Sequence, residues 1–181
     1  MVFRKISVYV LLVGLSAIIG GIYGVLHDQI SYTFSPEYFT QLKFEQFGLL
    51  WAYDSPRLGA AVVGWMATWW MGVIVSIFLG AFGFYTFETP KLMASNLVRA
   101  VLVVVGVALL TGLLGLAWGY IRVTPRSIDT YLNFIPDGVQ NPVQFVRVGF
   151  MHNASYLGGL TGLLAGIFYL FQQKDKQEDS A

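Results

Sequence analysis

Four long apolar stretches constrain the fold of this chain more than any other feature of its sequence. An α-helix needs about 20 mostly apolar residues to cross the hydrocarbon core of a bilayer. Residues 6–27, 58–87, 100–121 and 143–171 meet that requirement. Only 12% of the residues are charged, against about 25% in soluble domains, so a soluble fold has nowhere to place this apolar surface. The sequence predicts an all-α integral membrane protein, a four-transmembrane-helix bundle.

Proline positions mark where the helices begin. Five of the six prolines follow a Ser, Thr or Asn, at positions 36, 56, 90, 125 and 142. A capping residue followed by proline is typical of a helix N-terminus. The pattern predicts that the second and fourth spans begin at Pro56 and Pro142. It also predicts a short helix over residues 36–47, between the first two spans. This segment is too short and too polar to cross. Its aromatic residues predict an extracytoplasmic helix that either lies in the interface or folds back over the bundle.

The spans and the charges near them predict one domain and an orientation. Residues 1–171 are expected to form a single transmembrane domain, followed by a polar cytoplasmic tail over residues 172–181. Four spans place both termini on the same side. Positive charges divide almost evenly between the two sides, but Arg4 and Lys5 directly precede the first span, which favours cytoplasmic termini. The four spans predict a multi-pass protein in contact with the lipid bilayer.

Small residues recur along the spans at intervals of four. The second span carries the longest series: Gly64, Thr68, Gly72, Ser76 and Gly80. Such stripes allow helix backbones to approach closely in lipid. They predict a compact bundle. They also offer contact surfaces for a homo-oligomer or for a partner in a membrane complex.

Several classes of function find no support in the sequence. The chain has no cysteine, which excludes disulfides, iron–sulfur clusters and thiolate metal sites. The net charge is +1 without a basic run, so no nucleic-acid partner is expected. The spans lack the ionisable residues that proton-coupled transporters generally carry. Hydrolase, phosphate-binding and dinucleotide-binding motifs are also absent from the sequence.

Polar residues gather instead at the end of the bundle opposite the termini. Both histidines, His27 and His152, are expected there, because the first span leaves the membrane where the fourth enters it. Asp28 would lie at the C-terminal end of its helix, where the dipole disfavours an anion. Glu37 and Glu45 share a face of the short helix. These five residues predict a mixed nitrogen and oxygen site for a divalent transition metal: zinc, iron, manganese or copper.

Other polar residues at the same end are candidates for balancing charge or holding a ligand. These are Arg57, Arg147, Asn153 and Tyr156. The cluster also has a purely structural interpretation, in which Asp28 pairs with one of the two arginines. The sequence leaves open whether a metal site here only binds an ion or also activates water for hydrolysis.

Two further interpretations remain open. His27 and His152 could be the axial ligands of a haem b, although carboxylates crowd them. Alternatively, the protein is a non-catalytic accessory subunit of a larger membrane complex. It would then use the small-residue stripes and Trp65, Trp69 and Trp70 as contact surfaces.

Two segments carry a resemblance to other proteins. "HDQISYTFSPEYF" (residues 27–39) and "MHNASYLGG" (residues 151–159) resemble segments of an uncharacterised family of bacterial four-span inner-membrane proteins. The resemblance covers most of the chain. It implies a bacterial inner-membrane location and implies no activity.

Overall fold

The computed structural model describes residues 1–178, with side chains described through residue 175. The described chain is helical and has no strands, with four helices long and apolar enough to cross a membrane. The four-span, all-α class predicted from the sequence is therefore confirmed. These long helices are α1 (Val2–Phe34), α4 (Pro56–Thr86), α5 (Pro90–Arg122) and α6 (Pro142–Glu178).

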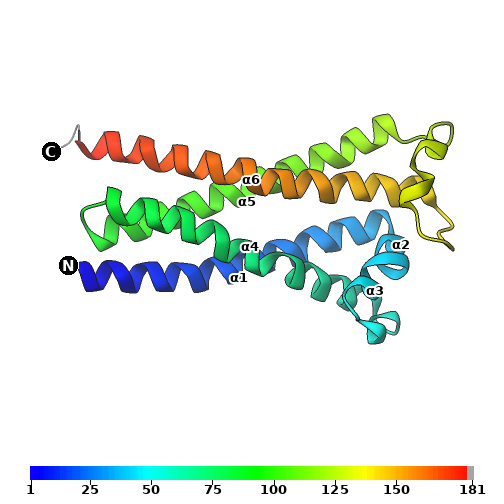
Figure 1. Ribbon diagram of the computed structural model, residues 1–181, viewed down its shortest axis with the longest axis horizontal. Coiled ribbons are helices and arrows are strands. Elements are labelled where there is room, and N and C mark those ends of the chain that lie inside the picture. Colours follow the sequence, from blue (N-terminus) through cyan, green and yellow to red (C-terminus); the bar gives the residue numbers. More distant parts are fainter. Residues whose placement is uncertain (179–181) are drawn as a thin grey trace.

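The four helices lie side by side, with both chain termini at one end of the bundle (Figure 1). The short α4–α5 connection lies at that same end. The two longer connections lie at the other end. Helix α1 packs closely against α4, and α5 against α6, while contacts between these two pairs are fewer. The bundle is thus built from two tight helix pairs.

The predicted helix starts are confirmed by the structure. Helices begin at Pro36, Pro56 and Pro142, and α5 begins at Pro90. The Thr89 hydroxyl accepts a hydrogen bond from the Leu92 amide, as expected of an N-cap. Pro125 follows the same sequence pattern but lies in the turn before the short 3₁₀ helix η3 (Ile128–Phe134).

The connection between α1 and α4 folds into a nearly continuous helical segment. It comprises α2 (Pro36–Tyr38), the π-helical turn η1 (Phe39–Lys43) and α3 (Phe44–Gln46), followed by the 3₁₀ helix η2 (Leu50–Tyr53). We call residues 36–46 the cover segment. Phe39 and Phe44 of this segment are fully buried in an aromatic and aliphatic cluster with α4 and α6. The cover segment therefore closes one end of the bundle instead of lying free on the membrane surface.

Two helices continue beyond the expected spans. Helix α1 runs to Phe34, so Asp28 does not lie at its C-terminal end, and the expected conflict with the helix dipole does not arise. Helix α6 continues through residue 178. Residues 179–181 of the expected tail lie outside the described part of the chain.

The small-residue stripes are used within the bundle. Gly24 of α1 and Gly64 of α4 bring their backbones into direct contact. The Thr68 hydroxyl lies 2.8 Å from the Gly20 carbonyl oxygen of α1 and 2.7 Å from the Gly64 carbonyl oxygen of its own helix. This close approach places α4 directly beside the part of α1 that carries His27.

We expect Gly24→Ala to destabilise the protein, because the added Cβ would collide with the backbone of Gly64 and the hydroxyl of Thr68. Overpacking of this kind costs about 1–3 kcal/mol. Gly14→Ala on the same helix is the matched control, because a Cβ there meets no atom within 4 Å. Thermal unfolding in detergent, followed by circular dichroism, measures both. Equal midpoints for the two variants would contradict the proposed close contact.

Candidate metal centre

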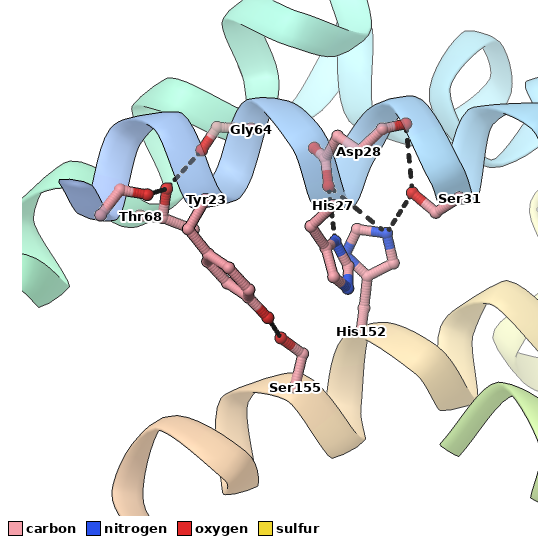
Figure 2. A network of polar contacts seen from close by, with 9 residues as sticks. Tyr23, His27, Asp28, Ser31, Gly64, Thr68, His152 and Ser155 are labelled. Carbon is pink, nitrogen blue, oxygen red and sulfur yellow. Dashed lines mark hydrogen bonds and ion pairs between the residues drawn. The ribbon is translucent and has the colours of Figure 1, made fainter. Parts of the chain in front are cut away.

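The candidate site forms where α1 faces α6. His27, Asp28 and His152 are each less than 10% exposed. Nδ1 of His27 lies 3.0 Å from Oδ1 of Asp28, and Nε2 of His152 lies 3.8 Å from the same oxygen. Figure 2 shows both imidazoles directed at this carboxylate. The two histidines and Asp28, which the sequence predicted to lie at one end, thus converge on one point.

The spacing of these three side chains is compatible with a metal ion. One potential donor atom from each lies within 4.8 Å of the others. Ligands about 2.0–2.2 Å from a tetrahedral zinc ion lie about 3.3–3.6 Å from one another. The separations from Asp28 Oδ1, 3.0 and 3.8 Å, fall on either side of this range. All three donor atoms lie within 4.8 Å of one another, which is wider than tetrahedral zinc ligation, so the side chains would have to move closer together to bind one ion.

One nitrogen of the cluster has no partner. Nε2 of His27 is buried and makes no hydrogen bond in the described structure. A buried polar atom without a partner carries a desolvation cost of about 1–3 kcal/mol. Such groups are rare, and each requires an explanation. The protein atoms alone therefore do not satisfy the cluster.

The geometry of the two imidazoles bears on the haem interpretation. Their ring centroids lie 4.7 Å apart, and the rings meet edge to face at 87°. A bis-histidine haem places the porphyrin between its two axial ligands. Rings in direct contact leave no space for that macrocycle, so this arrangement favours a single ion over a haem.

Aromatic side chains of the cover segment separate His152 from water. The ring of Tyr38 stacks on the imidazole with centroids 4.6 Å apart and an angle of 28°. Phe39 contacts the same imidazole edge to face, at 6.1 Å. Burial raises the pKa of the Tyr38 hydroxyl, and the nearby Tyr156 and Asp28 add to that effect. Tyr38 is therefore a neutral wall of the site.

Lys43 is a site residue that the sequence analysis did not identify. It lines a cavity of about 20 Å³ together with the two histidines and Asp28. Burial lowers the pKa of the Lys43 amine, and the negative charge of Asp28 partly opposes this. The π-helical turn ends at Lys43. Such turns often occur at functional sites, but no sequence pattern indicated one here.

Hydroxyl groups also lie around the three donor side chains. The Ser31 hydroxyl lies 3.2 Å from Nε2 of His152, and Ser31 follows His27 by one helical turn on α1. That four-residue spacing was the available sequence signal. The Tyr23 hydroxyl forms a short hydrogen bond with Ser155, which ties α1 to α6 just below the site (Figure 2). Tyr156, a predicted ligand-binding residue, lines the small cavity.

The two glutamates of the cover segment lie elsewhere. The Glu37 carboxylate accepts hydrogen bonds from the backbone N–H groups of Gln140 and Asn141, each 2.8 Å long. It thereby fastens the cover segment to the start of α6. Glu45 is exposed. Neither glutamate belongs to the group of donor side chains that His27, Asp28 and His152 form in the described structure.

The predicted charge-balancing residues also have other contacts. Both Nε and Nη2 of Arg147 donate to the Val123 carbonyl oxygen at the end of α5. The Arg57 side chain donates to the side chains of Gln29 and Thr33. Asn153 is exposed. The two arginines therefore stabilise helix ends in the described structure and make no ion pair with Asp28.

Comparisons with known proteins leave the site to be interpreted from its own geometry. No known protein family, curated protein or solved structure matches the chain.

We expect Glu37→Gln to loosen the cover segment without removing any atom of the metal centre. The substitution keeps the shape of the side chain but removes a charged acceptor of two backbone hydrogen bonds. Bonds to a charged group contribute about 1.5–3 kcal/mol. Hydrogen exchange should become faster over residues 36–46 and 138–141. Glu45→Gln, at an exposed position, is the matched control, and similar exchange in both variants would count against the fastening role.

Proposed function

We propose that this protein is a multi-pass membrane protein that binds one divalent transition metal ion through His27, Asp28 and His152. The observation that carries the proposal is the convergence of three buried donor side chains, with donor atoms within 4.8 Å of one another. Nε2 of His27 is a further buried polar atom without a partner. It is not the nitrogen that faces Asp28, because that contact is made by Nδ1. The imidazole could therefore offer an ion either of its two nitrogens.

The donor set restricts the choice of ion. Two imidazoles and one carboxylate suit zinc, iron(II), manganese or copper better than calcium or magnesium, which prefer oxygen donors. Three protein ligands leave at least one coordination position open. The adjoining cavity of about 20 Å³ has room for one water-sized ligand. A metal ion with an open position can act as a Lewis acid or activate water, so the site is suited to chemistry as well as to binding.

The proposed site lies toward the end of the bundle opposite the N-terminus, because His27 lies in the last part of α1 (Val2–Phe34) and His152 in the first part of α6 (Pro142–Glu178). With Arg4 and Lys5 retained in the cytoplasm, that end is extracytoplasmic. In a bacterial inner membrane the ion would therefore come from the outer side of the bilayer.

The alternative of a non-catalytic accessory subunit receives less support. The small-residue stripes that would serve a partner are occupied by contacts between α1 and α4. The outward-facing Trp65, Trp69 and Trp70 remain partly exposed. Exposed aromatic residues on a spanning helix are equally expected in contact with lipid.

We expect the detergent-purified protein to contain one transition metal ion per chain, or to bind one when zinc is added. Elemental analysis and a competition titration with a chromophoric chelator measure stoichiometry and affinity. Asp28→Asn and His152→Ala should each lower the affinity about 100-fold or more, since loss of even an outer partner typically costs 10–100-fold. Saturating zinc should raise the unfolding free energy of the wild type by about 2.7 kcal/mol at 100 times its Kd.

Glu45→Ala is the control for this experiment, because Glu45 is exposed and lies away from the cluster. It should leave the zinc affinity unchanged. A wild-type protein that binds no metal, and whose thermal midpoint does not respond to added zinc or to chelator, would refute the proposal.

A further inference from the structure

The chemistry around the small cavity points to a second component of the site. Lys43 lines this cavity together with the three donor residues. Its amine donates to Gln46 Oε1 at 2.9 Å and lies 5.5 Å from the ring centroid of Tyr38. Both of these partners are neutral. A cationic side chain thus lies beside a candidate site for a second cation.

The charges of the loaded site would not balance. A divalent ion contributes +2, Asp28 contributes −1, and the imidazoles that bind a metal are neutral. Lys43, which is half-buried beside them, adds a further +1, which leaves a net charge of +2 around the buried donor residues. Uncompensated buried charge is costly. Among the described residues that line the cavity, Asp28 is the only acid, and the others are neutral apart from Lys43 and the histidines. The chain itself does not supply the missing negative charge.

The shape of the cavity indicates where that charge would lie. Its volume of about 20 Å³ fits one atom group the size of a water molecule. The three metal donors and Lys43 of the cover segment all line it. A single oxygen or nitrogen atom there can occupy the open coordination position and accept a hydrogen bond from the amine. Such charge-assisted bonds are among the strongest in proteins.

We infer that the metal-loaded site takes an anionic ligand that bridges the ion and the Lys43 amine. This inference rests on the proposed metal site and names the class of its ligand. The ligand is hydroxide from solvent or another small anion that places a single donor atom in the cavity of about 20 Å³. Lys43 is a positioning residue in this arrangement, because it acts on the ligand and does not bind the metal.

The test uses the full-length protein in detergent, loaded with Co²⁺, whose visible absorption reports changes in coordination. Azide is the anionic probe. We expect azide to change the spectrum in a saturable manner. Lys43→Met keeps the length of the side chain and removes its charge. It should retain Co²⁺ and weaken azide binding about tenfold or more, while Lys43→Arg should restore much of the affinity. Lys91→Met, at an exposed position near the opposite end of the bundle, should behave like the wild type.

The outcomes separate this inference from the metal site itself. If Co²⁺ binds but azide leaves its spectrum unchanged, or if Lys43→Met binds azide as tightly as the wild type, the inference is overturned and the metal site stands. If Co²⁺ does not bind to the wild type, both fail. Weaker azide binding at higher pH, together with a spectral change before azide is added, identifies hydroxide as the resident anion. Azide affinity that does not depend on pH identifies an anion from another source.

Discussion

The buried carboxylate of Asp28 is the constraint on which the rest of the site depends. Transferring an ionised carboxylate out of water is costly unless cations or hydrogen-bond donors replace its hydration. Here the nearest groups are two imidazoles, from His27 on the same helix and His152 on α6. These contacts hold α1 and α6 together at the level of the site. The aromatic residues of the cover segment then exclude water from the cluster. A metal ion would satisfy the same carboxylate more fully than neutral imidazoles do.

The architecture places this constraint between the two helix pairs. Contacts within α1/α4 and within α5/α6 are dense, because glycines allow their backbones to meet. Between the pairs, a mostly apolar cavity of about 70 Å³ lies among all four helices. Ser16 lines this cavity, and its hydroxyl has no hydrogen-bond partner in the described structure. This cavity shares Tyr23 and Ser155 with the smaller cavity of the site. An ion held by α1 and α6 would therefore join the pairs where their packing is weakest.

The sequence predicted the parts of this structure that depend on long-range regularity. Apolar length predicted the four spans, the proline positions predicted where helices begin, and topology alone brought His27 and His152 together. It failed where local geometry departs from a regular α-helix. No sequence pattern indicated the π-helical turn, which ends at Lys43, a residue that lines the cavity. The positions of charged residues in the sequence also could not show that Arg147 donates hydrogen bonds to a backbone carbonyl oxygen. Which carbonyl oxygens at a helix end lack a partner becomes visible only in the folded structure.

Selectivity in such a site has to come from more than the three protein donors. The donor types and their approximate spacing are set by His27, Asp28 and His152. For a given set of nitrogen and oxygen donors, the affinities of first-row metals follow a common order. Selectivity between these metals depends mainly on the coordination geometry and on which metals are available. The surroundings add a second criterion. A low-polarity pocket with Lys43 at its edge disfavours any cation that arrives without a negative ligand, because the excess charge cannot be solvated there. The site would then bind the metal ion together with its anion. The negative charge of Asp28 and the positive charge of Lys43 would determine the net charge that this pair must have.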